Sequence, residues 1–274
     1  MRLRLRHRLR LSFAEPVRNV IAVLRITPRS HDGQRVTNWR IDVEPDCFLK
    51  AGEDHFGNLV HTLTLPGLVS EFTVTARGEL AAFDAAGVVR GSAERLPIEL
   101  YHRDTPLTAP DAALRVFAAE AVAGSDNRVG QMHRLMAAVH EAVAFDAEGT
   151  GAPSAQQAFA DRRATARGHA QVFVACARAL GAPARCAAGY LLAGDAGSRR
   201  HSWAEVFVEG LGWVGFDTVH EICPQDHHVR VAVGLDAVEA DTLRGAYGVV
   251  PDETVEVQWL FGRDPGPLAA AASS

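Results

Sequence analysis

The hydrophobic period of the sequence changes near Pro110, and this change constrains the fold more than any other feature. Before it, apolar and polar residues alternate, as in Leu3–Phe13 and Glu71–Leu80, and a period of two predicts half-buried β-strands. After it, apolar residues within 127–145 recur at spacings of three and four, which is one face of an amphipathic helix. The chain therefore begins with a β part and continues with helices before strands return.

Turn-forming residues divide both parts into elements. Glu15-Pro16, Pro28, Asp32-Gly33 and Phe56-Gly57-Asn58 separate short strands in the first part, a pattern typical of a β-sandwich-like domain. In the second part the expected helices are 111–123, 127–145, a short one capped by Ser154, and 167–180 ended by Gly181. The expected strands there are 184–192, 201–208, 213–218, 229–235 and 254–261.

These elements predict an α+β protein in two parts. Residues 1–105 form an N-terminal β-sandwich-like domain, and residues 106–261 form a core of helices packed on an antiparallel sheet. Gly210-Leu211-Gly212 is a tight turn that joins two strands of this core in a hairpin. Residues 262–274 form a small-residue tail that we expect to be disordered.

Composition excludes several classes of function. The 274 residues carry a formal net charge of −5, so nothing general attracts the chain to nucleic acid or to an anionic membrane. No apolar run reaches the roughly 18 residues of a membrane span, and we expect a soluble cytoplasmic protein. The four cysteines form no Cys-x-x-Cys pair, which argues against a zinc or redox motif. They are Cys47, Cys176, Cys186 and Cys223.

The strongest signal for chemistry lies in two short motifs, His201-Ser-Trp-Ala-Glu205 and Gly212-Trp-Val-Gly-Phe-Asp217. They resemble the transglutaminase-like superfamily, whose core is a papain-like cysteine fold. Phe13-Ala-Glu-Pro-Val17 and Asp54-His-Phe-Gly-Asn58 resemble the N-terminal region of the bacterial transglutaminase-like family. The resemblance covers about residues 1–261, and it implies that the helices and sheet of the second part form the papain-like core.

The resemblance implies a Cys-His-Asp site. In the family, a thiolate attacks an amide or acyl carbonyl to form a thioester, which water or an amine resolves. The histidine and the helix N-terminus lower the pKa of the thiol, and the aspartate orients the imidazole. His201 and Asp217 match the family histidine and aspartate.

The nucleophile does not match. Relatives read roughly Gly-x-Cys-x-Asp before this helix, whereas here Ala166 stands at the cysteine position. Cys176 lies ten residues later, about 15 Å along the helix and on another face, so we interpret it as a core residue. Thr165 has a hydroxyl but would need a strong base to act in place of the thiol.

Alanine at this position has two explanations. One is an engineered replacement of cysteine, and the other is natural divergence. An engineered change would leave its neighbours typical of the family, but Ala164 replaces the usual Gly, Gly168 the usual Asp, His169 an aromatic residue and Gln171 the usual His. These departures favour natural divergence.

The sequence therefore favours a catalytically inactive member that binds a peptide or protein partner. The alternative is an active cysteine protease, amidase or acyl-transferase, if Ala166 replaces a natural Cys. A third hypothesis, water activated directly by His201 and Asp217, is weaker because a lone dyad is a poor amide hydrolase.

The remaining candidate residues fall into two groups. We place Trp203, Trp213, His169 and Gln171 around the pocket of the site. His220, Asp226, His227 and His228 form a His-rich stretch, which lacks a metal-ligand pattern, so that we expect neither metal nor cofactor. The oligomeric state stays open.

Overall fold

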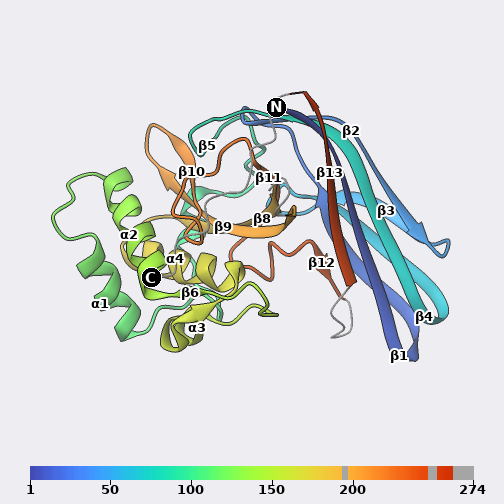
Figure 1. Ribbon diagram of the computed structural model, residues 1–274. Coiled ribbons are helices and arrows are strands. Elements are labelled where there is room, and N and C mark those ends of the chain that lie inside the picture. The colour runs from blue at the N-terminus through green and yellow to red at the C-terminus, as the bar shows by residue number, and fades with distance from the viewer. Residues whose placement is uncertain (193–196, 246–251, 262–274) are drawn as a thin grey trace.

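The computed structural model describes residues 1–192, 197–245 and 252–261. Two large antiparallel sheets and a group of helices make up the fold (Figure 1), so the predicted α+β class is confirmed. The predicted tail, 262–274, lies outside the described residues. No helix in the described ranges is long and apolar enough to cross a membrane.

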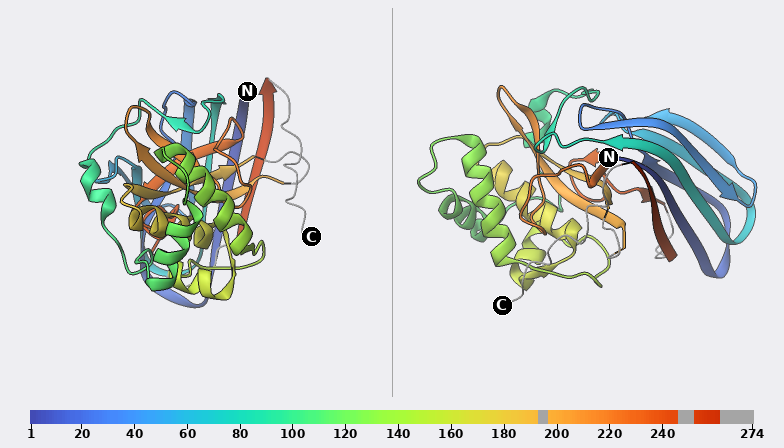
Figure 2. Two further views of the ribbon diagram at one scale, coloured as in Figure 1. Left: turned by 90° about the vertical axis from the view of Figure 1, so that its left-hand side faces the viewer. Right: turned by 45° about the horizontal axis from the view of Figure 1, so that its top comes forward.

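The larger sheet is built on two long strands that pair along most of their length. β2 and β3 pair with opposite halves of β4, and β13 and β12 pair with opposite halves of β1. One hydrophobic cluster collects buried side chains from both halves of β1, among them Leu9 and Leu24, and Figure 2 shows the sheet strongly curved. The strands are β1 (Arg2–Thr27), β2 (Gln34–Glu44), β3 (Phe48–Glu53), β4 (Leu59–Ala82), β12 (Leu243–Arg244) and β13 (Asp252–Phe261).

The predicted strand break at Glu15-Pro16 is wrong, because β1 continues through it. The pairing with β4 shifts register between Ser12 and Val17, so the proline, which cannot donate to the ladder, is absorbed as an irregularity rather than a turn. In the same way, the alternation predicted over Glu71–Leu80 is part of one longer strand, β4, which begins at Leu59. Burial does not alternate along β3, and its sequence accordingly lacks the period of two that predicts a strand.

The smaller sheet has the strand order β11-β8-β9-β10-β5. Helices cover one side of it, and the large sheet lies on the other side (Figures 1 and 2). Its strands are β5 (Val88–Val89), β8 (Ala184–Leu191), β9 (Arg199–Val208), β10 (Gly212–Phe216) and β11 (His228–Gly234). The other elements are η1 (Ile98–His102), α1 (Ala112–Ala121), α2 (Arg128–Ala142), α3 (Ala155–Asp161), α4 (Ala166–Ala179) and the short pair β6 (Ala144–Phe145) and β7 (Arg163–Ala164).

Helix α4 lies at the centre of the core. It packs on β8 and β9 on one side and on α1, α2 and α3 on the other, so every residue from Gly168 to Arg178 is buried. Arg178 satisfies its buried guanidinium with the carbonyls of Tyr101, Ala184 and Leu235. Enclosure on all sides fixes the direction of α4 and therefore the place where its N-terminus emerges.

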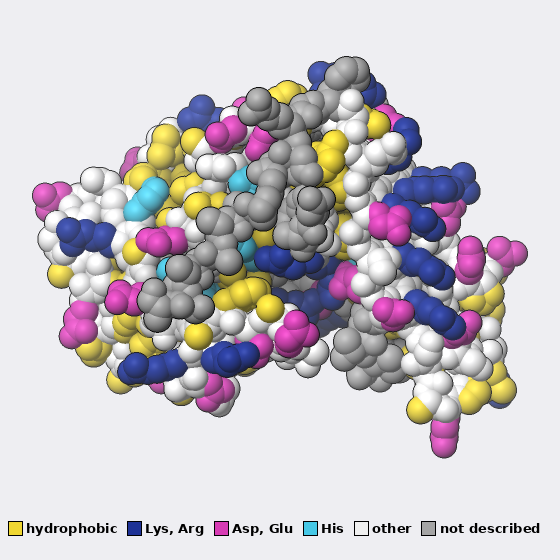
Figure 3. All heavy atoms as spheres, viewed as in Figure 1, with side chains coloured by type: hydrophobic (Ala, Val, Ile, Leu, Met, Phe, Trp, Pro, Cys, Tyr) yellow, Lys and Arg dark blue, Asp and Glu magenta, His cyan; other side chains and the backbone are white. Residues whose placement is uncertain are grey.

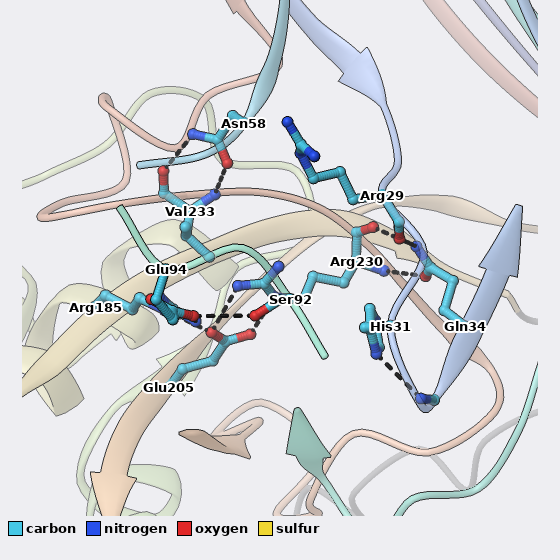
Figure 4. Close-up of polar contacts among 11 residues, drawn as sticks. Arg29, His31, Gln34, Asn58, Ser92, Glu94, Arg185, Glu205, Arg230 and Val233 are labelled. Carbon is cyan, nitrogen blue, oxygen red and sulfur yellow. Dashed lines mark hydrogen bonds and ion pairs between the residues drawn. The ribbon is translucent and has the colours of Figure 1, made fainter. Parts of the chain in front are cut away.

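The two parts of the chain exchange segments. β13, from the end of the chain, is a strand of the N-terminal sheet, and β5, from the first part, pairs with β10 in the core sheet. Side chains also cross the junction (Figure 4): Gln34 bonds to both backbone groups of Arg230, and Asn58 does the same to Val233. The predicted ranges 1–105 and 106–261 are thus interleaved in space.

A buried ion network lies beside this junction (Figure 4). The Glu205 carboxylate accepts from Arg185 at 2.7 Å and from Arg230 at 2.6 Å. Arg185 also pairs with Glu94 and lies over the Trp213 ring, 3.7 Å from its centroid. Burial alone would raise the pKa of Glu205, but the charges of Arg230 and Arg185 outweigh it and lower this pKa to about 2.

We expect Glu205→Gln to lower the free energy of unfolding by about 3–5 kcal/mol, because it leaves two arginines without their buried countercharge. Urea denaturation at pH 7 measures this. The difference from the wild type should shrink as the pH falls from 4.5 toward 2, since the wild-type carboxylate is then protonated as well. Glu71→Gln is the control, because its pair with Arg10 is exposed, and it should leave the free energy of unfolding nearly unchanged. A Glu205→Gln protein as stable as this control would contradict the network's role.

Candidate active site

Ala166 is the first residue of α4, as its sequence position predicts. Thr165 is the N-cap, and its hydroxyl accepts from the Gly168 N–H at 3.5 Å. The remaining free N–H groups of the first turn concentrate partial positive charge at this point. The position therefore suits an anionic nucleophile, but the alanine methyl group supplies none.

His201 and Asp217 come together across neighbouring strands. His201 lies on β9, and Asp217 directly follows β10, its hairpin partner. The His201 Nε2 atom is 2.7 Å from the Asp217 Oδ2 atom, and both side chains are buried. The structure thus joins the two residues that the motifs single out.

Two more histidines bind the same carboxylate oxygen. His220 Nδ1 is 2.8 Å and His228 Nε2 is 3.0 Å from Asp217 Oδ2, and the Val219 N–H donates to Oδ1 at 3.0 Å. We call His201, His220, His228 and Asp217 the Asp217 hub. A carboxylate with four donors around it is stabilised in its ionised form.

The hub defines the tautomers of its imidazoles. An ionised carboxylate only accepts, so each ring must donate from the nitrogen that faces it. His228 Nδ1 accepts from the Gln225 N–H, and His220 Nε2 accepts from Arg199 at 3.5 Å, which makes both rings neutral. In His201 the nitrogen bound to Asp217 is Nε2, so Nδ1 is the nitrogen that remains for other partners.

Electrostatics keep the negative charge on Asp217. Burial alone would raise the pKa of this carboxyl, but His201 and the bonds from His220 and His228 lower it well below its usual value. Burial lowers the pKa of His228, against the opposing effect of Asp217. The hub is therefore an ionised carboxylate that is stabilised by His201 and by the hydrogen bonds from His220 and His228.

Three ligand atoms of the hub, from His201, Asp217 and His220, lie within 4.8 Å of one another, close enough to hold a metal ion. Each is already engaged in a short hydrogen bond, and the Arg199 guanidinium beside His220 adds a positive charge that disfavours a cation. We therefore interpret the group as a hydrogen-bonded hub.

Ala166 and His201 line one cleft of about 750 Å³. Its walls come from the 145–151 loop, the start of α4, the start of β9, and the segment that precedes β12. Glu253 of β13 also lines it, so the N-terminal sheet contributes to the cleft through the strand that joins it from the end of the chain. In Figure 3, Lys and Arg side chains gather in the hollow between the two parts of the molecule.

The other residues that we placed around the pocket lie deeper. Trp203 and Trp213 are buried in one hydrophobic cluster with Tyr101. His169 is buried, and burial lowers its pKa to about 4. Gln171 is buried and bonds to the Pro153 carbonyl. None of these four is among the residues that line the cleft.

No cysteine lines the cleft, although all four lie in the described part of the chain. Cys176 and Cys186 are buried, and burial raises the pKa of Cys176 to about 12. Cys223 lies 3.7 Å from His133, and burial raises its pKa also. Thr165 does line the cleft, but its hydroxyl oxygen caps α4.

Sequence reasoning missed the roles of three residues. His228 and His220 were noted only as parts of a His-rich stretch, and Arg199 carried no motif. These residues contact Asp217 or each other, and the contacting residues are up to 21 positions apart in the sequence. The spacing of His220, three residues after Asp217, is the one local signal that pointed to such a contact.

Comparison with solved structures finds the same fold in one protein and a weaker similarity in another. A candidate cysteine protease from Cytophaga hutchinsonii is 17% identical, with a TM-score of 0.77, over 98% of this chain and 94% of that one. The periplasmic domain of TgpA from Pseudomonas aeruginosa, solved bound to ethylmercury, is 14% identical, with a TM-score of 0.39, over 80% of this chain and 90% of that one. Comparison with curated protein sequences gives no match.

Sequence profiles of two families match the chain. The bacterial transglutaminase-like N-terminal region matches residues 3–81, which contain β1 to β4, and the transglutaminase-like superfamily core matches residues 115–218, from α1 through Asp217. Both matches agree with the motifs, with the positions of Ala166 and His201 in one cleft, and with the bond from His201 to Asp217. The chain therefore belongs to the transglutaminase-like superfamily and begins with the bacterial transglutaminase-like N-terminal region.

Proposed function

We propose that this protein is a catalytically inactive transglutaminase-like protein. It binds either a free peptide or a peptide segment of a partner protein in the cleft beside Ala166. The observation that carries the proposal is the alanine at the N-terminus of α4, in a cleft that keeps the His201–Asp217 pair. The cleft volume of about 750 Å³ is in the range of ligand-binding pockets.

The packing around Ala166 supports natural divergence. A Cβ atom added to Gly168 would come within 2.6 Å of the Ala164 Cβ and 3.1 Å of the Pro153 Cγ. The aspartate typical of relatives at position 168 therefore does not fit beside an alanine at 164. The two departures are coupled, as accumulated substitutions are, whereas a single engineered replacement of cysteine would leave the family pair of Gly and Asp in place.

The proposal also includes a cytoplasmic location. All four cysteines are free, and reduced thiols are typical of proteins of the cytoplasm.

The alternative function is that of an active thiol enzyme, and it requires a natural cysteine at position 166. The Ala166→Cys variant, which tests the site, also tests this alternative.

We expect the protein with Ala166 to show no thiol-dependent hydrolysis or amine transfer on glutamine-containing peptides. Loss of the nucleophile of such a triad removes most of the rate, about 10⁶-fold in a well-studied case. Ammonia release and incorporation of a primary amine measure this, with and without iodoacetamide. Turnover that iodoacetamide abolishes would disprove the inactive assignment.

We expect Ala166→Cys to create a reactive thiol, because the helix N-terminus and His201 would both stabilise a thiolate. The pH dependence of alkylation by iodoacetamide, followed by peptide mass mapping, should show a pKa at least about one unit below the ordinary 8.5. Ala147→Cys is the matched control, since Ala147 is exposed and lines the same cleft on a loop rather than on a helix. Equal pH profiles for the two introduced thiols would show that the site no longer activates a nucleophile.

We expect His201→Ala to lower the free energy of unfolding by about 1–3 kcal/mol, because it removes a donor from a buried carboxylate. Chemical denaturation measures this, and His102→Ala, at an exposed histidine, should change stability by less than about 0.5 kcal/mol. If His201→Ala is as stable as the wild type, the pair has no structural role and serves a ligand instead.

A further inference from the structure

Three arginines of the described ranges line the cleft, and two of them are neutralised within the protein. Arg167 pairs with Asp241 at 2.9 Å. Arg200 pairs with Asp241 at 3.1 Å and also with Glu253. Because carboxylates of the cleft wall already pair with both guanidinium groups, these two arginines attract a further anion only weakly.

Arg199 differs from both. Among the described residues no carboxylate lies within 4.0 Å of its guanidinium, and the polar contact that the structure gives it is the 3.5 Å bond to His220 Nε2. His220 is neutral in the hub, and the Asp217 carboxylate on the other side of this ring is already bonded to His220 and His201. Burial lowers the pKa of Arg199, which Asp217 only partly opposes. As far as the described residues go, the cleft therefore contains a half-buried positive charge without a countercharge in direct contact.

The position of Arg199 places this charge next to the former catalytic centre. Arg199 and His201 are two residues apart on β9, so their side chains share a face of the strand, with their Cα atoms about 6.6 Å apart. Both also contact His220, Arg199 by its hydrogen bond and His201 with ring centroids 5.1 Å apart. An extended peptide advances about 3.3 Å per residue, so a group bound at Arg199 lies about two residues from one bound at His201.

We propose that Arg199 anchors a carboxylate of the peptide that occupies this cleft, so that the ligand class is an acidic peptide. The inference rests on the proposed peptide-binding function. A guanidinium offers a planar fork that matches a carboxylate. A monoanion matches the single charge of Arg199, because the carboxylates of Asp241 and Glu253 already neutralise Arg167 and Arg200. Both the C-terminus of a peptide and an Asp or Glu side chain carry this chemistry.

Three tetrapeptides separate these sources and test the charge. They are acetyl-Ala-Ala-Glu-Ala-amide, acetyl-Ala-Ala-Gln-Ala with a free C-terminus, and the neutral acetyl-Ala-Ala-Gln-Ala-amide. Each is titrated into ¹⁵N-labelled full-length protein, and shifts of cleft amide signals give a Kd. In the wild type at least one anionic peptide should bind about tenfold or more tightly than the neutral one, the effect expected of a charge-assisted hydrogen bond. The tighter of the two identifies the carboxylate source.

Arg199→Gln should abolish this preference and leave the affinity for the neutral peptide unchanged, because glutamine retains an N–H donor for His220. Arg199→Lys should retain a smaller preference, since it keeps the charge and loses the fork. Arg167→Gln is the matched control: it removes an arginine from the same cleft that already has Asp241 as its partner, and the preference should persist.

Two results would overturn the inference while peptide binding stands. One is equal affinity of the wild type for all three peptides, and the other is an anion preference that survives in Arg199→Gln. If no peptide of either charge shifts a cleft signal, the peptide-binding function itself is disproved, and the carboxylate preference with it.

Discussion

Two carboxylates without solvent exposure, Glu205 and Asp217, impose the strongest constraint on this structure. A carboxylate that leaves water must find donors or lose its charge. Glu205 finds Arg185 and Arg230, and the strand that carries Arg230 also receives Gln34 from the N-terminal sheet. Asp217 finds three histidines. Meeting these needs fixes β8, β9, β10, β11 and the turn after β10 relative to one another.

The same constraint explains how the site keeps its form without a nucleophile. The Asp217 hub is satisfied by residues of the hairpin and of β11, and none of its bonds involves α4. A residue without a thiol at position 166 therefore leaves the bonds around Asp217 intact. Changes at the start of α4, where Ala164 and Gly168 fit together, can accumulate without disturbing the hub, so this geometry does not depend on a thiol at position 166.

Local patterns in the sequence predicted the parts of the fold that depend on neighbouring residues. The period of two in β1 and β4, the Ser154 cap of α3 and the hairpin over Gly210–Gly212 all have short-range causes. The continuity of β1 through Pro16 and the pairing of β13 with β1 could not be predicted, because each depends on a distant partner strand. His201, Asp217 and Ala166 were found from motifs, whereas His228 and Arg199 have roles that only tertiary contacts create.

The N-terminal sheet acquires a function from this arrangement. His7 of β1 bonds to Glu253 of β13, which in turn pairs with Arg200 at the cleft. Through this chain of contacts the sheet neutralises Arg200, which follows Arg199 directly on β9. The two neighbouring arginines thus differ because Arg200 pairs with Glu253, on a strand of the N-terminal sheet, and with Asp241, whereas neither carboxylate pairs with Arg199. The sheet does more than support the core, because it supplies a countercharge to an arginine of the cleft.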